Sequence, residues 1–292
     1  MCGIFSAISL GNPFDREDFN NFKKATDLVS YRGPDAAGYR TFQNKDNLTE
    51  NSFDVFFGHR RLSIIDLSED GNQPMENNGV SIIYNGEIFN YLELREELKR
   101  NNVLFKTNSD TEVILKIYEI YGNQGFSKLN GMWAFTIYDS NKKLIIASRD
   151  RFSIKPLFWT RIDDKFFFAS EIKQLLRFLP HLEINKKTVS LYILQGLMDN
   201  SSETFFSGIE RLESKSNLII NLVTGKISKE QYWDYELKTI QEKNITESFM
   251  ELFNDSVRIR LRSDVELGAL LSGGLDSSAI SIAILSKKNS NQ

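Results

Sequence analysis

Short runs of apolar residues along the chain predict a series of β-strands. Runs of this length, bounded by polar or turn-forming residues, are typical of buried strands. They lie at 2–10, 53–58, 61–66, 80–84, 132–138, 144–149, 157–160 and 166–169. Polar turns, such as Asp-Ser-Asn-Lys at 139–142, join several of the runs in pairs. We therefore expect antiparallel hairpins.

Apolar residues at helical spacing predict helices between these strands. The segments lie at 15–31, 90–101, 110–121, about 171–178 and 246–262. Asn90 stands where a side chain caps a helix, and Asp110 begins the helix that follows. Hairpins with helix pairs between them indicate an α+β fold rather than βαβ repeats. A four-layer αββα sandwich fits this order, although the pattern alone does not single it out.

The last third of the chain changes in character. Residues 205–233 predict one more hairpin, and the polar stretch 236–245 predicts a connector. After the helix at 246–262, an apolar strand at 265–271 leads into a glycine-rich loop and a final helix. Strand, glycine-rich loop and helix in this order begin an α/β nucleotide-binding unit. We divide the chain into a domain at 2–208, a hairpin and connector at 209–245, and an incomplete α/β domain at 246–292.

Composition excludes several classes of protein. The chain has 292 residues, a formal net charge of -3 and a pI of about 5.7. It therefore lacks the basic character expected of a nucleic-acid partner. No segment approaches the roughly 20 apolar residues of a membrane helix, and the N-terminus does not resemble a signal peptide. These features predict a cytoplasmic protein.

The single cysteine is the second residue of the chain. A lone cysteine forms no internal disulfide and no cysteine-based zinc cluster, and it is often a small buried hydrophobe. The position of Cys2 favours a different role. Removal of Met1 would leave the thiol beside a free α-amine, whose usual pKa of about 7.7–8.0 suits a general base. This arrangement makes a histidine partner unnecessary, although His59 and His181 are present.

Several motifs occur in a fixed order along the chain. They are Cys-Gly-Ile-Phe at 2–5, Arg-Gly-Pro-Asp at 32–35, Arg-Leu-Ser-Ile-Ile-Asp at 61–66, Asn-Gly-Glu-Ile-Phe-Asn at 85–90, Ser-Asp-Thr-Glu at 109–112, Gly-Met-Trp-Ala-Phe at 131–135, Arg-Asp-Arg-Phe at 149–152, Lys-Pro-Leu at 155–157, Ala-Ser-Glu-Ile-Lys at 169–173 and Ser-Gly-Gly-Leu-Asp-Ser-Ser at 272–278. Together they resemble the class II, N-terminal-nucleophile amidotransferases, in the asparagine synthetase branch.

The resemblance implies a glutaminase site. Cys2 would be the nucleophile, and Asn85 with Gly86 would form the oxyanion hole. Arg61 would bind the α-carboxylate of L-glutamine and Asp110 its α-ammonium group. The other implied glutamine-binding residues are Leu62, Ile64, Ile65 and Glu87.

Each of these residues also has a structural interpretation. Asn85 and Gly86 form the sequence of a plain hairpin turn, Arg61 could be a surface residue on a strand, and Asp110 could be a helix N-cap. His59 and Arg60 are expected to be structural. We prefer the site because a helix, and not a second strand, is predicted directly after Asn85-Gly86.

A second site is implied at the loop 272–278. Amide groups of a glycine-rich turn and of the following helix favour phosphate, although the loop alone could be merely flexible. By resemblance, the loop would hold the pyrophosphate of ATP. The implied residues are Leu271, Ser272, Gly273, Gly274, Leu275, Asp276 and Ser277. Asp276 would bind Mg²⁺, which prefers carboxylate and phosphate oxygens.

The sequence departs from the family at a few positions. Ala36 and Ser153 stand where the family has glycine, which would add strain if either position has φ > 0. Residues 212–215 replace a Leu-Pro-Pro-Gly turn. The chain also ends soon after the pyrophosphate loop. We expect a fragment, a truncated reading frame, or a separate chain that supplies the remaining domain; a homodimer is also left open.

The resemblance implies a glutamine-dependent asparagine synthetase. Glutamine would be hydrolysed through a thioester on Cys2, without a cofactor, and ammonia would pass to an aspartyl-adenylate made from L-aspartate and ATP. This chain alone is expected to act as a glutaminase. Two alternatives remain: transfer to another carboxylate, such as a sugar acid in surface-polysaccharide synthesis, and an inactive remnant that serves as a binding module.

Overall fold

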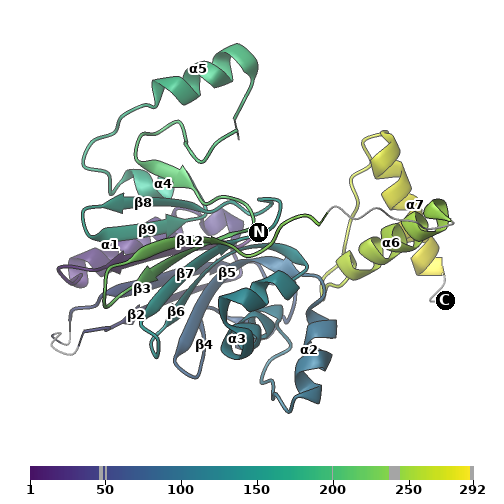
Figure 1. The fold of residues 1–292 in the computed structure, drawn as a ribbon, viewed down its shortest axis with the longest axis horizontal. Coiled ribbons are helices and arrows are strands. Elements are labelled where there is room, and N and C mark those ends of the chain that lie inside the picture. Colours follow the sequence, from purple (N-terminus) through teal and green to yellow (C-terminus); the bar gives the residue numbers. More distant parts are fainter. Residues whose placement is uncertain (46–48, 50, 199, 237–243, 290–292) are drawn as a thin grey trace.

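The computed structural model describes residues 1–45, 49, 51–198, 200–236 and 244–289. Two six-stranded sheets pack face to face, and helices cover their outer faces (Figure 1). Neighbouring strands within each sheet run antiparallel. The architecture confirms the predicted α+β class and the four-layer αββα sandwich.

The first sheet has β1 near its centre, so the N-terminus of the chain is held by strands on both sides. Its order is β10-β8-β9-β1-β3-β2. The strands are β1 (Gly3–Ser9), β2 (Ala36–Phe42), β3 (Val55–Arg61), β8 (Phe158–Ile162), β9 (Lys165–Ala169) and β10 (Ile209–Arg211). Because β1 is buried along its whole length, Cys2, which directly precedes it, lies at the edge of the core.

The second sheet has the order β12-β11-β7-β6-β5-β4. Its strands are β4 (Met75–Asn77), β5 (Val80–Ile88), β6 (Gly131–Asp139), β7 (Leu144–Arg149), β11 (Ser216–Asn221) and β12 (Ile227–Gln231). Strands drawn from 209–231 therefore complete both sheets. Within the predicted hairpin at 205–233, a turn at Thr224-Gly225 joins β11 to β12 and has φ +69° at Gly225.

The helices are α1 (Arg16–Asp27), α2 (Tyr91–Arg100), α3 (Asp110–Tyr121), α4 (Ile172–Leu176), α5 (Lys186–Gln195), α6 (Ile245–Arg260) and α7 (Leu275–Asn289), with short 3₁₀ turns at Ser30–Arg32, Glu69–Gly71 and Gly122–Lys128. Helices α1 and α4 pack on the first sheet, and α2 and α3 pack on the second. Across the described residues, no helix is both long and apolar enough to span a membrane.

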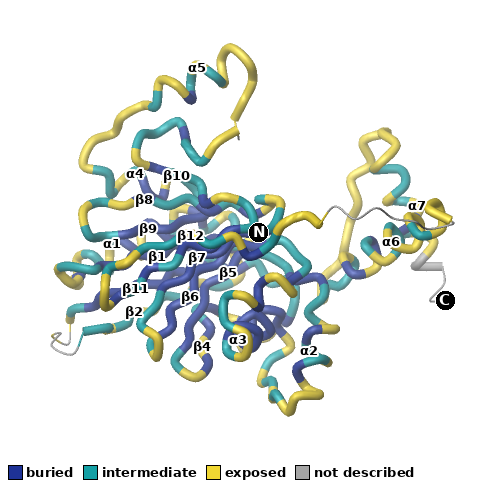
Figure 2. Tube along the Cα trace, viewed as in Figure 1, coloured by how far each residue is buried: buried dark blue, intermediate teal, exposed yellow. Residues whose placement is uncertain are grey.

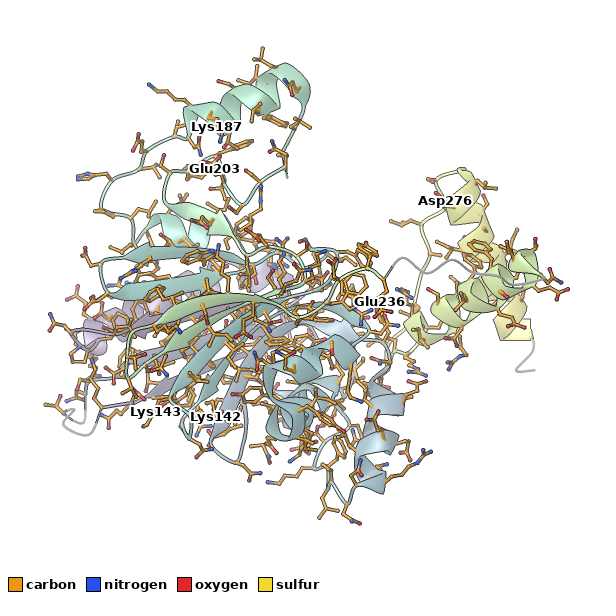
Figure 3. The ribbon with its side chains drawn as sticks, viewed as in Figure 1. Lys142, Lys143, Lys187, Glu203, Glu236 and Asp276 are labelled. Atoms are coloured by element: carbon orange, nitrogen blue, oxygen red, sulfur yellow. The ribbon has the colours of Figure 1, made fainter. Side chains whose placement is uncertain are left out.

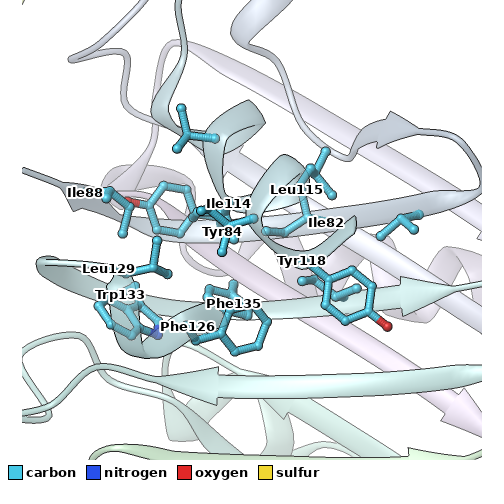
Figure 4. Close-up of a cluster of buried hydrophobic side chains, with 14 of the residues drawn as sticks. Ile82, Tyr84, Ile88, Ile114, Leu115, Tyr118, Phe126, Leu129, Trp133 and Phe135 are labelled. Atoms are coloured by element: carbon cyan, nitrogen blue, oxygen red, sulfur yellow. The ribbon is translucent and has the colours of Figure 1, made fainter. Parts of the chain in front are cut away.

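The apolar core forms three layers, one between the sheets and one under each helical layer. Under α3, Ile114 and Tyr118 belong to one buried cluster with Tyr84, Phe126 and Trp133 (Figure 4). The central strands of both sheets are buried, whereas the segment around α6 and α7 is largely exposed (Figure 2). The rigid part of the molecule is therefore the sandwich.

Two predicted boundaries near the motifs were wrong. The predicted strand at 61–66 does not form, since β3 ends at Arg61 and Asp66 has φ +57°. The predicted turn at Asn85-Gly86 is also absent, because β5 continues to Ile88 and both residues pair with β6. A Cβ on Gly86 would lie 2.2 Å from the carbonyl oxygen of Met132. Here strand pairing overrides the local preference of Asn-Gly for a turn.

Other differences lie outside the motifs. Strand β2 and helix α5 were not predicted. Residues 265–271 do not form the predicted strand; no described strand lies beside them, and Leu270 is 96% exposed. Most of the predicted connector at 236–245 lies outside the described residues, as do the last residues of the chain, 290–292.

Ala36 and Ser153, which stand where the family has glycine, differ in backbone conformation. Ala36 lies in β2 with ordinary extended backbone, but Ser153 has φ +57°. A left-handed conformation costs an L-residue roughly 1–2 kcal/mol, and glycine loses roughly 0.5–1 kcal/mol in conformational entropy on folding. We therefore expect Ser153→Gly to raise the free energy of unfolding by about 0.5–1 kcal/mol. Urea denaturation measures this, and Ser153→Ala should give no gain.

Candidate active site

All residues implied for glutamine binding line one pocket at the ends of β1, β3 and β5 and the start of α3. The lining residues are Met1, Cys2, Arg61, Leu62, Ile64, Ile65, Gly71, Gln73, Tyr84, Asn85, Gly86, Glu87, Ser109, Asp110, Thr111 and Lys155. They come from separate parts of the chain, and the sandwich brings them together.

Cys2 occupies the pocket directly before β1. The amide of Leu62 donates a hydrogen bond to its Sγ at 3.3 Å, and its carbonyl oxygen accepts one from Arg32 Nε at 3.0 Å. Burial raises the pKa of the thiol, although the Leu62 hydrogen bond acts in the opposite direction. The thiol therefore needs a nearby base to become a nucleophile at neutral pH.

Met1 lines the same pocket, so the chain terminus itself lies at the site. Burial lowers the pKa of the terminal amine, and the positive charges of Lys155 and Arg32 lower it further. After removal of Met1, the amine of Cys2 would lie among the same groups. These surroundings favour a neutral amine, which is the form that accepts a proton.

Asn85 is the most unusual polar residue of the pocket. Its side chain is 1% exposed, yet neither its Nδ2 nor its Oδ1 has a hydrogen-bond partner within the described part of the chain. A buried amide without a partner costs about 1–3 kcal/mol. A ligand atom bound in the pocket would supply the missing hydrogen-bond partner.

The edge of β5 presents a row of amide groups to the pocket. The N–H of Tyr84 donates to Gln73 Oε1 at 2.6 Å, and the N–H of Ile88 donates to Asp110 Oδ2 at 2.9 Å. Because alternate residues of a strand direct their amides to the same side, the N–H of Gly86 also lies on this edge. We find no acceptor for it among the residues described. Asn85 and Gly86 thus offer two adjacent donors.

Arg61 is held by the loop that follows it. Its guanidinium donates to the carbonyl oxygen of Ser68 at 2.7 Å, to Asn72 Oδ1 at 2.9 Å and to the carbonyl oxygen of Asp66. A guanidinium has five N–H donors, so up to two remain for a ligand. A Cβ on Gly71 would lie 2.2 Å from Arg61 Nη2, so a larger residue there would displace the guanidinium.

Asp110 lies opposite, in the first turn of α3. Its carboxylate accepts from the hydroxyl of Tyr84 and the amide of Ile88, each at 2.9 Å. Burial raises the pKa of Asp110 to about 6, and the neighbouring Glu87 contributes in the same direction. Ser109, and not Asp110, is the N-cap of α3, since its side chain accepts from the amide of Thr111. Asp110 therefore serves the pocket.

Five polar residues that line the pocket were not predicted as site residues, namely Gln73, Tyr84, Ser109, Thr111 and Lys155. Tyr84 holds Asp110, and Gln73 links the amide of Tyr84 to the hydroxyl of Thr111. Lys155 is 5% exposed, and burial lowers its pKa. Lys155 belongs to the Lys-Pro-Leu motif at 155–157, which could have pointed to it as a site residue. No local sequence pattern marks Gln73.

His59 and Arg60 do not line the pocket, in line with the structural roles expected for them. His59 Nε2 lies 3.1 Å from the carbonyl oxygen of Tyr84, and burial lowers the pKa of His59 to about 3. The imidazole is therefore neutral. Its contact with Tyr84 joins β3 of the first sheet to β5 of the second.

The second predicted site lies apart from this pocket. Residues 271–276 are exposed, Gly273 has φ +83° and α7 begins at Leu275. Asp276 is in the first turn of α7, away from the sandwich (Figure 3). The described residues contain no cluster of three acidic, histidine or cysteine side chains that could bind a metal on its own. Amides at the start of α7 and the carboxylate of Asp276 nevertheless suit a phosphate with Mg²⁺.

Comparison with known proteins agrees with this geometry. Residues 1–233 match the glutamine amidotransferase domain family, and residues 248–291 match the asparagine synthase family. A putative glutamine-hydrolysing asparagine synthetase from Methanocaldococcus jannaschii is 39% identical over 301 residues, covering 96% of this chain and 56% of the relative. Glutamine-hydrolysing asparagine synthetase 1 from Bacillus subtilis is 38% identical, with 96% and 43% covered. The chain thus spans about half the length of these relatives.

A solved structure has the same fold. The glutamine phosphoribosylpyrophosphate amidotransferase of Bacillus subtilis aligns with a TM-score of 0.58 over 82% of this chain and 51% of that one. Sequence identity is 19%, so the likeness concerns the sandwich alone.

Proposed function

Because this chain belongs to the glutamine amidotransferase family, we propose that it hydrolyses L-glutamine to L-glutamate and ammonia at the pocket around Cys2. The observation that carries the proposal is the buried, unpartnered amide of Asn85 beside a cysteine at the chain terminus. An oxyanion hole requires such a donor, placed in advance and shielded from water.

The reaction begins with Cys2 as nucleophile. The α-amine of Cys2 takes the thiol proton, and Sγ forms a bond to the side-chain carbonyl carbon of glutamine. The resulting oxyanion is stabilised by Asn85 Nδ2 and the N–H of Gly86. When the C–N bond breaks, the protonated amine gives its proton to the leaving nitrogen and ammonia departs. Water then attacks the thioester, which releases glutamate and restores the thiol.

The two ends of the pocket suit the two charges of an amino acid. Arg61 keeps donors for the α-carboxylate, and Asp110 offers a buried carboxylate for the α-ammonium group. Leu62, Ile64 and Ile65 line the same pocket. Glutamine bound in this way would direct its side-chain amide toward Cys2 and Asn85.

The raised pKa of Asp110 leads to a testable pH dependence. Since this pKa is about 6, protonation below that pH removes the charge that would attract the α-ammonium group. We expect kcat/KM for glutamine to fall as pH decreases through about 6. At pH 7, Asp110→Asn should raise KM about ten- to a hundredfold, the effect of losing a charged hydrogen bond. Glutamate release between pH 5 and 8 measures both.

Glu87 is the matched control, because burial also raises its pKa and it lines the same pocket. The decline should persist in Glu87→Gln, moved to lower pH because the Glu87 charge helps to raise the pKa of Asp110, and it should disappear in Asp110→Asn. If the decline disappears in Glu87→Gln instead, the assignment of Asp110 is wrong.

For the complete protein, we propose glutamine-dependent synthesis of asparagine from L-aspartate. The match of residues 248–291 to the asparagine synthase family supports this proposal. Residues 272–277 would hold the pyrophosphate of ATP, and Asp276 would bind Mg²⁺. ATP, when bound there, would activate the carboxylate that receives ammonia.

A direct assay tests the glutaminase proposal. The purified chain is incubated with glutamine, and the release of glutamate and ammonia is measured over time. We expect the two products in equal amounts. A glutamine analogue with an electrophilic ketone in place of the amide should attach to the N-terminal residue, as seen by mass spectrometry of the N-terminal peptide. No glutamate above the buffer blank, with Met1 already removed, would refute the proposal.

A further inference from the structure

The segment directly after α6 returns to the glutamine pocket. Asp264 Oδ2 accepts a hydrogen bond from the amide of Asp66 at 2.7 Å, and the amide of Asp264 donates to the carbonyl oxygen of Ile64 at 2.9 Å. The two bonds bracket Ile65, and both isoleucines line the pocket. A single residue about two hundred positions away in sequence thus binds the backbone on both sides of a pocket residue.

The loop that Asp264 holds has no regular secondary structure of its own. It begins after β3 at Arg61, and Asp66 within it has φ +57°. Loops without ladder hydrogen bonds depend on such outside contacts for a defined shape.

Asp66 connects this loop to both charged ends of the pocket. Its carbonyl oxygen accepts from the guanidinium of Arg61, and its carboxylate accepts from the amide of Asn108 at 2.9 Å, just before α3. Hydrogen bonds from Ser68 and Asn108 lower the pKa of Asp66 against the opposing effect of burial. Asp264 therefore binds Asp66, the residue that orients both Arg61 and the start of α3.

Arg262 fixes the same segment to the chain that follows β5. Its guanidinium donates to both carboxylate oxygens of Glu93 in α2 and to the carbonyl oxygen of Phe89, directly after β5. Bidentate pairs of this kind set orientation as well as distance. The segment 262–264 is thus held across the loops that follow β3 and β5.

We propose that Asp264 is a positioning residue for glutamine binding, which rests on the proposed glutaminase function. By fixing the backbone around Ile65, it keeps Arg61 directed at the ligand carboxylate. Because Asp264 lies within residues 248–291, which match the asparagine synthase family, glutamine affinity depends on where that part of the chain lies. By linkage, bound glutamine in turn favours the docked position of the segment 262–264.

The test compares Asp264→Ala, Asp264→Asn and the control Glu266→Ala, whose side chain is exposed nearby. In Asp264→Ala, KM for glutamine should rise about three- to tenfold, as for the loss of one hydrogen bond, with kcat within about twofold. Asp264→Asn should keep a KM close to that of the unchanged chain, because its amide oxygen still accepts from Asp66. Glu266→Ala should leave both constants unchanged.

Hydrogen exchange of the backbone amides gives a readout that does not depend on catalysis. Exchange at residues 62–68 should accelerate in Asp264→Ala and not in Glu266→Ala, while exchange in β1 and β5 stays unchanged. An unaltered KM with unaltered exchange, or a loss confined to kcat, would overturn the proposal. Absence of glutaminase in the unchanged chain would instead overturn the proposed function, and the exchange result would still decide whether Asp264 holds the loop.

Discussion

Glutamate release should fall at least about a thousandfold in Cys2→Ala, because removal of the nucleophile leaves only the binding and oxyanion contributions. Alanine is also small enough for Met1 to be removed, so the variant keeps its terminal amine. The substitution therefore isolates the thiol from the base. Steady-state assays with glutamine measure the loss, and mass spectrometry of the N-terminal peptide confirms the terminus in both proteins.

Glutamine should still bind to Cys2→Ala, because Arg61 and Asp110 are intact. Binding to the folded state raises the melting temperature, so the shift in melting temperature with glutamine should remain. A variant that keeps a tenth of the activity would exclude Cys2 as the nucleophile. A variant that loses both activity and the shift would point to Cys2 as part of the binding pocket.

Asn85→Ala should lower kcat about a hundred- to a thousandfold, the effect of losing one donor of an oxyanion hole. KM should change only a few-fold, since the donor acts mainly on the charge that develops in the transition state. Stability should not fall, because the amide has no partner to lose and its unpartnered burial itself costs about 1–3 kcal/mol. A structural asparagine would instead cost about 1–3 kcal/mol on removal. Glutamate release and urea denaturation separate the two roles.

Asn217 is the matched control for this experiment. It lies in β11, is 1% exposed, and both atoms of its side-chain amide are also without a partner. It does not line the pocket. Asn217→Ala should therefore leave kcat unchanged. Equal losses of kcat in the two variants would mean that the effect reflects general damage to the sandwich.

The motifs alone were enough to name the main residues of the glutamine pocket. Cys2, Arg61, Asn85 and Asp110 were named from the sequence, and the structure brings all four to one pocket. Their surroundings were predicted less well. Asn85-Gly86 has the sequence of a turn, but it lies within β5 because pairing with β6 continues to Ile88.

The residues that support the site were largely invisible in the sequence. Gln73 is joined to Tyr84 and Thr111 only through the folded backbone, and no local pattern marks such a contact. The same holds for Asp264, whose partners Ile64 and Asp66 lie about two hundred residues away.

The sequence by itself determined the α+β class, most strands and helices, and the chemical groups of the site. The strands and helices follow from apolar periodicity, which is a property of short segments, whereas the residues of the site were implied by the resemblance of the motifs to a known family. The tertiary structure alone decided the order of the strands in the two sheets, where β3 and β5 end, and which amides of the pocket are left without partners. Those outcomes depend on packing between distant segments, where burial and strand pairing outweigh the weak preferences of single residues.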